Sequence, residues 1–372
     1  MSEEIHIVPS STWMPPGQGP VIIAGPCSAE SEEQIITVAE QLAKDDRVRL
    51  IRAGVWKPRT RPNSFEGMGA QALPWLRKAT EAFGKPFIIE VANAEHVRMA
   101  LDAGIEHVWV GARTTVNPFS VQEIADALEG KDIPVLVKNP LNPDLQLWMG
   151  ALERFSKAGL HKLMAIHRGF STYKDQGYRN APNWDIPIEL KTKLPNIEIL
   201  VDPSHISGKQ SLVQEVSQRA FDLAFDGLMV ETHPNPDEAL SDPKQQWFLS
   251  DFGSFLDGLE TRTRSSEEGF RSDRLVQLRA LIDEVDHEII NTLKRRMEIV
   301  EDLGQYKSDS GIAIFQLERW LDILCDRTEH GRKVDLDPDL IQAIWKAIHN
   351  ASIRRQSEFV QAKTEEHDIF GI

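Results

Sequence analysis

Two short stretches, EILVDPSHISGK at residues 198–209 and GLMVETHPNPDEALSD at residues 227–242, indicate the fold. Each begins with an apolar, strand-like run and stops at a polar turn that carries His205 or Glu231. A helix-length segment separates the two. A buried parallel strand that ends on such a residue directs its side chain to the open end of the sheet. We therefore read this region as strand, turn, helix, strand and turn.

The same alternation recurs from the first apolar run onward. The apolar runs are residues 21–25, 50–54, 87–91, 107–111, 135–138, 163–167, 199–201 and 228–230. Segments with helical periodicity, such as residues 32–43 and 71–82, separate them. Eight alternating βα units in about 250 residues predict an α/β fold, the (β/α)8 TIM barrel. A doubly wound open sheet is the alternative, but no glycine fingerprint of that fold follows the first run.

A second domain is predicted beyond the barrel. We assign residues 1–255 to the barrel, residues 256–271 to a polar, glycine-containing linker, and residues 272–372 to a small all-α three-helix domain. Ser272 is a candidate N-cap. Apolar residues at helical spacing predict helices over about 272–307, 316–329 and 338–363. The first would be about 50 Å long, so we expect it to pack against a partner.

Composition excludes several classes of protein. The 372 residues carry a formal net charge of −15, which argues against nucleic acid and anionic membranes as partners. No apolar run approaches the roughly 20 residues that span a bilayer, and the acidic start does not resemble a signal peptide. Cys27 and Cys325 form no disulfide framework, so we expect a reducing, cytoplasmic setting.

The strand ends carry potential metal ligands. Cys27 follows the first apolar run, and the opening stretches add an imidazole and two carboxylates. A thiolate, an imidazole and carboxylates together suit a borderline divalent ion such as manganese, iron, cobalt or zinc. The alternative is that His205 caps a helix and Glu231 is a solvated loop acid. The combination of all these donors favours the metal.

Cations also gather at the predicted strand ends. The charged residues there are Arg52, Lys57, Arg59, Arg61, Glu90, Arg113, Lys138 and Arg168. Such a ring of cations repels itself unless anions balance it. Arginine binds phosphate and carboxylate through two parallel hydrogen bonds, and lysine adds a point charge. We expect substrates that carry more than one phosphate or carboxylate.

The motifs in this region resemble a known family. Those motifs are GPCS at 25–28, KPRT at 57–60, GAR at 111–113, DPSH at 202–205 and the segment 231–242. Over roughly residues 20–255 the chain resembles the shorter-barrel 3-deoxy-D-arabino-heptulosonate 7-phosphate synthases. The resemblance implies condensation of phosphoenolpyruvate with erythrose 4-phosphate, at the entry to aromatic amino acid biosynthesis. The related 3-deoxy-manno-octulosonate 8-phosphate synthases lack the KPRT turn and are the second choice.

The resemblance also implies roles for individual residues. Cys27, His205, Glu231 and Asp242 would hold a divalent metal ion. Arg52, Lys57, Arg113, Lys138 and Arg168 would bind phosphoenolpyruvate, with the Ala112–Arg113 backbone beside its phosphate. Arg59 and Thr60 would hold the phosphate of erythrose 4-phosphate. Glu90 is a candidate for accepting the proton of water, and the alternative is that it pairs with a nearby cation.

The helical segment resembles the all-helical chorismate mutases over roughly residues 270–362. The resemblance implies that Arg279 of a partner chain, Arg296 and Arg319 bind the substrate dicarboxylate. Lys307 and Gln356 would contact the ether oxygen from opposite sides, and Ser352 would assist binding. Two positions depart from that family: Gln316 replaces an aspartate, and Trp320 replaces a glutamate. Gln316 can still hydrogen bond to the substrate hydroxyl.

This resemblance suggests both an assembly and a regulatory role. We expect a homodimer through the helical domain, with chorismate and prephenate as its ligands. Because these are later products of the pathway, we expect the domain to act also as a feedback sensor of the barrel. The alternative is a non-catalytic domain that binds ligand and dimerises.

Overall fold

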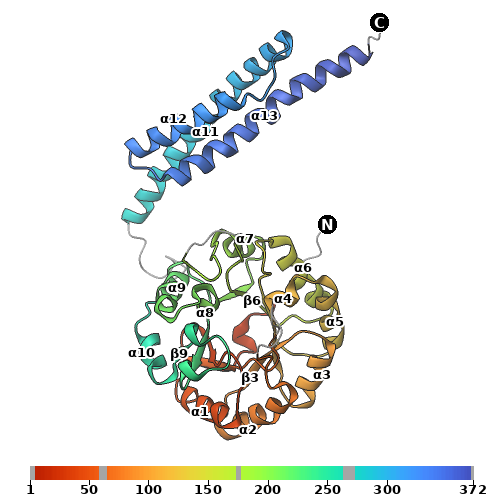
Figure 1. The fold of residues 1–372 in the computed structure, drawn as a ribbon, viewed down its shortest axis with the longest axis vertical. Coiled ribbons are helices and arrows are strands. Elements are labelled where there is room, and N and C mark those ends of the chain that lie inside the picture. The colour runs from red at the N-terminus through yellow and green to blue at the C-terminus, as the bar shows by residue number, and fades with distance from the viewer. Residues whose placement is uncertain (1–4, 58–64, 173–176, 263–272, 370–372) are drawn as a thin grey trace. The chain divides into compact units, whose positions relative to one another are not determined.

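The computed structural model describes residues 5–57, 65–172, 177–262 and 273–369, without the side chains of residues 273–276 and 359–369. The chain forms two compact units, Met1–Arg264 and Ser265–Ile372. The first is an α/β barrel and the second is helical (Figure 1). Arg59, Thr60 and Arg61 of the predicted site, and the predicted N-cap Ser272, lie outside the described residues.

The first unit is a closed barrel of eight parallel strands, as predicted. Neighbouring strands in the chain pair in order, and β1 also pairs with β8, which closes the ring. The strands are β1 Val21–Gly25, β2 Val48–Arg52, β3 Phe87–Val91, β4 His107–Val110, β5 Val135–Lys138, β6 Leu163–His167, β7 Glu198–Val201 and β8 Gly227–His233.

Helices surround the strands, as the view along the barrel shows (Figure 1). They are α1 Glu32–Leu42, α2 Leu73–Phe83, α3 Ala94–Asp102, α4 Ala112–Thr115, α5 Pro118–Leu128, α6 Leu145–Lys157, α7 Asp185–Lys193, α8 Pro203–Ser207, α9 Gln210–Asp222 and α10 Phe252–Asp257. Local sequence sets several of their starts. The side chains of Ser31, Asn93, Asn117 and Asp144 each accept a hydrogen bond from a first-turn backbone N–H.

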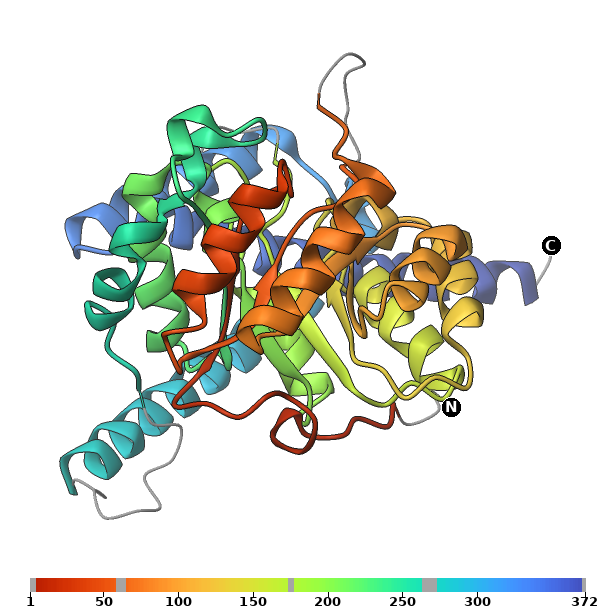
Figure 2. The same ribbon diagram turned by 90° about the horizontal axis from the view of Figure 1, so that it is seen from below.

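Two apolar layers hold the barrel together. One lies between the strands and the surrounding helices, and the other fills the barrel interior. The interior layer contains Ile23, Leu50, Ile88, Trp109, Leu136, Met164, Ile166, Leu200 and Met229. Met14 of the N-terminal segment belongs to the same layer, and that segment runs along one end of the barrel (Figure 2). This end of the barrel is therefore filled with apolar side chains.

The same inward positions become charged at the other end. Side chains alternate along a strand, so the inward residue after Leu50 is Arg52, and the one after Leu136 is Lys138. The same step of two leads from Ile88 to Glu90, from Ile166 to Arg168, from Leu200 to Asp202 and from Met229 to Glu231. The sequence thus stacks a charged layer directly on an apolar one.

Two predicted strand boundaries were wrong. The second strand covers Val48–Arg52 rather than residues 50–54, so that Arg52 is its last residue. The eighth strand continues to His233 instead of stopping before Glu231. It is longer because Glu231 pairs with Gly25 of β1, and because a short strand that the sequence did not predict, β9 Trp247–Phe248, pairs with Thr232 and His233. Glu231 is consequently a strand residue and not a loop acid.

The second unit consists of three helices, as predicted, and no strand occurs in its described residues. They are α11 Asp273–Ser310, α12 Leu317–Lys333 and α13 Pro338–Ile369. The first ends before Gly311, whose φ of +65° suits glycine. Near the predicted linker, α10 extends to Asp257 and buries Leu256. None of the helices that the structure describes is both long and apolar enough to cross a membrane.

Candidate active site

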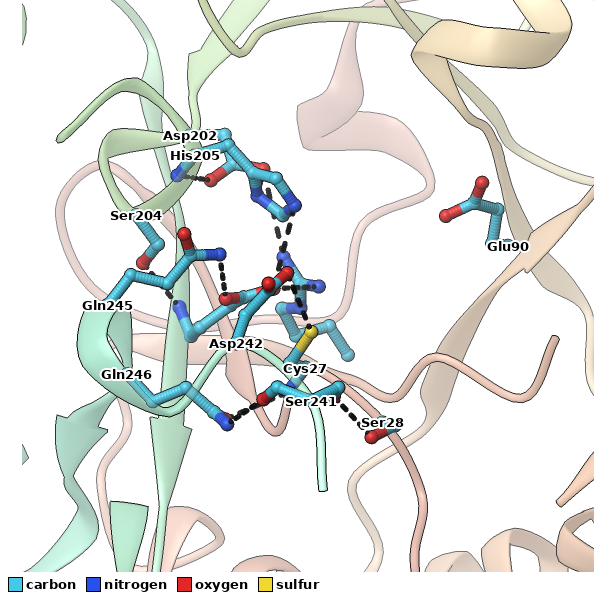
Figure 3. Close-up of polar contacts among 12 residues, drawn as sticks. Cys27, Ser28, Glu90, Asp202, Ser204, His205, Ser241, Asp242, Gln245 and Gln246 are labelled. Carbon is cyan, nitrogen blue, oxygen red and sulfur yellow. Dashed lines mark hydrogen bonds and ion pairs between the residues drawn. The ribbon is translucent and has the colours of Figure 1, made fainter. Parts of the chain in front are cut away.

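Three of the predicted metal ligands converge at the charged end of the barrel. The ligand atoms of Cys27, Glu231 and Asp242 all lie within 4.8 Å of one another. Cys27 and Glu231 are fully buried, and Cys27 Sγ lies 3.6 Å from Asp242 Oδ2 (Figure 3). One sulfur and two carboxylates in a buried cluster form a donor set that fits a borderline divalent ion.

His205 lies beside this cluster and is oriented by a neighbour. Its Nε2 atom is 3.8 Å from Glu231 Oε1, and its Nδ1 atom is 2.8 Å from Asp202 Oδ2. The carboxylate favours the tautomer with the proton on Nδ1, which leaves the Nε2 lone pair on the metal side. Burial lowers the pKa of His205, so the ring is neutral. The alternative that His205 caps a helix was wrong, since the N-cap of α8 is Asp202.

Several residues that hold the predicted metal ligands in place were not predicted from the sequence. Gln245 donates to Glu231 Oε2 at 2.6 Å, and Gln246 accepts from the backbone N–H of Cys27 at 2.9 Å. Arg179 donates to Gln245 and lies 3.2 Å from Asp242 Oδ1. Both glutamines follow the predicted motif 231–242 by only a few residues, but nothing in their identity distinguishes them from ordinary loop residues.

Backbone conformation also positions two of the ligands. Asp242 has a φ of +45°, which a residue other than glycine rarely adopts. At Gly25, two residues before Cys27, an added Cβ would lie 2.2 Å from the backbone oxygen of Arg52. A glycine is therefore required where β1 passes β2 and the chain turns toward Cys27.

Two buried ion pairs lie next to the cluster of predicted metal ligands. Arg52 Nη2 lies 2.8 Å from Glu231 Oε1, and Lys138 Nζ lies 2.7 Å from Asp202 Oδ2. Both cations also lie over Trp109, at 5.3 Å and 5.6 Å from its ring centroid. The Nε and Nη1 atoms of Arg52 are buried and have no hydrogen-bond partner in the described part of the chain. Unsatisfied buried donors of a guanidinium point to a missing anion.

Arg168 is a second buried guanidinium at this end of the barrel. Its Nη1 donates to Asn180 Oδ1 at 2.6 Å and to the backbone oxygen of Gly169. Both acceptors are neutral, and no carboxylate lies within ion-pair distance of Arg168 among the described residues. Burial lowers the pKa of Arg168 to about 10. An anionic ligand would supply the missing charge.

The remaining barrel candidates occupy the same end. Lys57 donates to the backbone oxygen and to Sγ of Cys27, at 2.8 Å and 3.0 Å. Ala112 begins α4 directly beyond β4, and Arg113 follows it. Glu90 accepts from Trp109 Nε1 at 3.1 Å and stands apart from the metal cluster (Figure 3). An added Cβ on Gly111 would lie 2.0 Å from Glu90 Oε1, so this glycine makes room for the carboxylate.

The electrostatics of the cluster depend on its charged neighbours. Burial raises the pKa of the Cys27 thiol to about 12, and the negative charge of Glu231 adds to the effect. Burial also opposes ionisation of Glu231, but the positive charges of Arg52 and Lys57, and of His205 when it is protonated, outweigh it and lower the pKa of Glu231. The carboxylate is thus ready to bind a cation, and a coordinating cation would deprotonate the thiol.

The helical unit brings together most of its predicted site residues. Arg296 on α11 donates to Ser352 Oγ on α13 at 2.6 Å, and Lys307 donates to the backbone oxygen of Ile314 at 2.7 Å. Gln356 packs on Gly304, where an added Cβ would lie 3.1 Å from its side chain. Its Oε1 atom is buried without a partner among the described residues. We call Arg296, Lys307, Ser352 and Gln356 the helical cluster.

Three predicted residues of the helical unit remain outside this cluster. Gln316 precedes the first residue of α12 and is exposed, and Arg319 is exposed in the first turn. Arg279 is exposed on α11. It lies 17 residues before Arg296 on one continuous helix, or roughly 25 Å away. Arg279 and Arg296 of one chain therefore cannot bind the same small ligand.

The two units match two different known families. The model of the DAHP synthetase I family matches residues 10–267, more than half of the chain. The chain belongs to the DAHP synthetase I family. A second family model, chorismate mutase type II, matches residues 278–357. The DAHP synthetase I barrel is thus followed by a chorismate mutase type II domain, which confirms both resemblances.

Curated relatives of this DAHP synthetase I family chain match the barrel. A phospho-2-dehydro-3-deoxyheptonate aldolase of Thermotoga maritima is 33% identical over 225 residues, which are 60% of this chain and 64% of the relative. The chain therefore covers less than two thirds of that relative. A 2-dehydro-3-deoxyphosphooctonate aldolase of Francisella tularensis is 24% identical over 253 residues, covering 63% of this chain and 88% of the relative.

Solved structures from Thermotoga maritima share the DAHP synthetase I barrel. The crystal structure of its phospho-2-dehydro-3-deoxyheptonate aldolase superposes with a TM-score of 0.57 and 28% identity, covering 64% of this chain and 67% of that one. A truncated form of its 3-deoxy-D-arabino-heptulosonate 7-phosphate synthase gives 0.55 and 27%, covering 64% and 84%.

Proposed function

We propose that the protein is a bifunctional cytoplasmic enzyme of aromatic amino acid biosynthesis. Its barrel would condense phosphoenolpyruvate with erythrose 4-phosphate, and its helical domain would rearrange chorismate to prephenate. The observation that carries the first assignment is the position of Cys27, Glu231 and Asp242 beside Arg52, whose Nε and Nη1 atoms are buried without a hydrogen-bond partner among the described residues. A metal-binding cluster next to anion-binding groups suits a reaction between two phosphorylated substrates.

The cations would orient the two substrates. Arg168 and Arg113 provide guanidinium groups for a phosphate, and Arg52 and Lys138 lie deeper, where the buried donors of Arg52 can meet a carboxylate. Such binding places carbon 3 of phosphoenolpyruvate against the aldehyde and removes the entropic cost of bringing them together. By resemblance, Arg59 and Thr60 would bind the phosphate of erythrose 4-phosphate.

The condensation forms one carbon–carbon bond and releases phosphate. Carbon 3 of phosphoenolpyruvate bonds to the aldehyde carbon, whose oxygen takes up a proton. Water adds to the electron-deficient carbon 2 and gives up a proton, for which Glu90 is our candidate acceptor, and phosphate then leaves carbon 2. A divalent ion held by Cys27, His205, Glu231 and Asp242 would polarise the aldehyde or orient the water. Manganese, iron, cobalt and zinc all suit this donor set.

The relatives named as octonate aldolases suggest an alternative activity for the barrel. Phosphoenolpyruvate supplies three carbons, so a heptulosonate requires a four-carbon sugar phosphate and an octonate requires a five-carbon one. By resemblance, the KPRT motif at residues 57–60 supports the four-carbon substrate. The test is to compare erythrose 4-phosphate with a five-carbon aldose phosphate in the same assay. Faster turnover of the five-carbon sugar would reverse the assignment.

The helical cluster supports the mutase proposal. Arg296 has no carboxylate partner among the described residues, and Lys307 and Gln356 are buried beside it. A rearrangement of chorismate needs a cationic site that binds the compact conformer, not a nucleophile or an acid. Arg296→Ala should abolish mutase turnover while the condensation persists. Unchanged turnover would favour the alternative, a domain that only binds ligand and dimerises.

The exposed half of α11 supports a homodimer. Every residue from 277 to 292 is exposed in the single chain, and Leu278, Leu281, Ile282, Val285 and Ile289 are among them. A row of apolar side chains on an unpacked helix requires a partner. A second chain would cover this surface and could bring its Arg279 to the helical cluster.

We also propose that chorismate or prephenate lowers the rate of condensation. Both are later products of the pathway, and the helical domain would bind them. If prephenate acts by weakening the binding of barrel substrates, those substrates must weaken the affinity of the helical domain for prephenate by the same factor. The test is to truncate the chain near Thr263 and assay condensation with and without prephenate. If saturating prephenate and chorismate do not change the condensation rate of the full-length protein, the chain is a simple fusion of two enzymes without regulation.

A further inference from the structure

The position that departs from the chorismate mutase pattern has an unexpected neighbour. Trp320 on α12 stacks on His349 of α13, with ring centroids 3.9 Å apart and planes inclined by 14°. Phe315 lies edge-on to the same imidazole, with its ring centroid 6.0 Å from that of His349. The imidazole is therefore fixed by aromatic contacts from outside its own helix.

His349 belongs to the same helix face as the helical cluster. Ser352 and Gln356 follow it by three and seven residues on α13, a spacing that places all three on one side of the helix. Ser352 holds Arg296 at 2.6 Å. The positive charges of Arg296 and Lys307 also act on His349 and favour its neutral form.

Two polar atoms on this face are buried without partners in the described part of the chain. They are His349 Nε2 and Gln356 Oε1. An unpaired buried polar atom is costly unless a ligand or water satisfies it. Burial and the two cations lower the pKa of His349, so the ring is neutral and adds no further positive charge. A neutral imidazole can donate to, or accept from, an oxygen atom.

We propose that His349 is a further substrate-binding residue of the mutase domain and that Trp320 is its positioning residue. His349 Nε2 would hydrogen bond to a hydroxyl or carboxylate oxygen of the bound substrate. Trp320, which cannot itself replace a carboxylate, holds the imidazole at the helical cluster. The inference rests on the proposed mutase function. It assigns to the Trp320–His349 pair the polar contact that the tryptophan alone cannot make.

The test uses variants that separate the hydrogen bond from the stacking. In full-length protein, His349→Leu should lower mutase kcat/KM by about 10- to 100-fold, the effect of removing a hydrogen bond to a charged or reacting group. His349→Gln, whose amide can take the place of Nε2, should recover most of the loss. His330→Leu, an exposed histidine on α12, is the matched control and should leave turnover unchanged. Condensation by the barrel should persist in all three, and circular dichroism checks their helix content.

The role of Trp320 requires a double-mutant cycle. Trp320→Ala should resemble His349→Leu, Trp320→Phe should lose only a few-fold, and the double variant Trp320→Ala with His349→Leu should be no worse than either single variant. Additive losses would mean that Trp320 has a separate structural role. His349→Leu within two-fold of the unmutated protein would overturn the inference and leave the mutase function intact.

Binding distinguishes failure of the inference from failure of the proposed function. Calorimetry with prephenate should show an affinity for His349→Leu that is about 10-fold weaker than for the unmutated protein. If the unmutated protein binds prephenate but does not turn over chorismate, the mutase function fails. The affinity of His349→Leu for prephenate then decides whether His349 binds the ligand. If it neither binds prephenate nor turns over chorismate, both proposals are overturned.

Discussion

Asp202 Oδ2 lies 2.7 Å from Lys138 Nζ and 2.8 Å from His205 Nδ1, so one buried carboxylate contacts both a predicted substrate ligand and a predicted metal ligand. Its other oxygen accepts the backbone N–H of His205 at 3.1 Å and thereby starts α8. The two oxygens of Asp202 thus fix the helix, the imidazole ring and the lysine at once. The predicted metal site and the predicted phosphoenolpyruvate site therefore share this support.

Asp202→Asn should impair both the stability and the activity of the barrel. The variant leaves Lys138 without its buried counter-charge, which costs about 3–5 kcal/mol when one partner of a buried pair is removed. Loss of the carboxylate behind His205 should lower metal affinity or condensation by about 10- to 100-fold. Calorimetric unfolding and metal titration measure the two effects. Asp132→Asn breaks an exposed pair with Lys162 and should change neither; equal effects in the two variants would refute the role of Asp202.

Removal of metal should separate the two activities. Chelation should abolish condensation and leave the mutase reaction unchanged, because the described helical residues contain no cluster of metal-ligand side chains. Cys27→Ser should weaken metal binding, since an alcohol is a far poorer ligand than a thiolate. Cys325→Ser, at the exposed free cysteine, is the matched control. Metal content and both rates are measured on the same samples, and loss of mutase activity with the metal would contradict the separation.

The two arginines assigned to different phosphates should affect different substrates. Arg168→Ala should raise the KM for phosphoenolpyruvate more than that for erythrose 4-phosphate, and Arg59→Ala should do the reverse. A lost charge-assisted hydrogen bond costs about 1.5–3 kcal/mol, which corresponds to a change of about 10- to 100-fold. Initial rates with each substrate varied in turn provide the comparison. If both variants raise the two KM values equally, the anions have been assigned to the wrong arginines.

The barrel should lose stability as the pH falls below the pKa of an ordinary histidine, about 6.5. Burial lowers the pKa of His167 to about 3. The unfolded chain takes up a proton near pH 6.5, whereas the folded barrel does not, so the contribution of neutral His167 is complete above that pH and is lost as the pH falls toward 3. The slope for one proton is about 1.4 kcal/mol per pH unit.

His167→Gln should flatten this slope between about pH 6 and pH 4, where the two protonation states differ most. Unfolding at a series of pH values measures the slope. His330→Gln should leave it unchanged, because this side chain is exposed. An equal slope for His167→Gln and the unmutated protein would show that the buried ring does not resist protonation.

Apolar runs that end on a charged residue explain why much of the fold could be predicted. The apolar runs identify the eight strands, and the step from Leu136 to Lys138 or from Met229 to Glu231 follows from side-chain alternation alone. The pairing of β8 with β9 could not be predicted, because two residues carry no periodicity. That pairing extends the strand by Thr232 and His233, beyond Glu231, which pairs with Gly25 of β1.

The parts of the site that the sequence missed are those that depend on contacts between distant residues. Asp202 was part of a recognised motif, but its contacts with Lys138 and Arg52 arise only when the strands close into a barrel. Gln245 and Arg179 lie in loops, where no spacing predicts a partner. Trp320 was identified as a departure from the mutase pattern, but its stacking with His349 requires the packing of α12 on α13.

We propose that the barrel performs a metal-dependent condensation in the same chain that carries a mutase domain. The most direct measurement follows heptulosonate 7-phosphate and phosphate formed from phosphoenolpyruvate and erythrose 4-phosphate by full-length protein, first demetallated and then reloaded with manganese, iron, cobalt or zinc in turn. We predict no product from the demetallated protein, equimolar heptulosonate and phosphate after reloading, and the same rate of chorismate consumption in both states. Full condensation without metal, or none with any of the four ions, would show that the barrel does not perform a metal-dependent condensation.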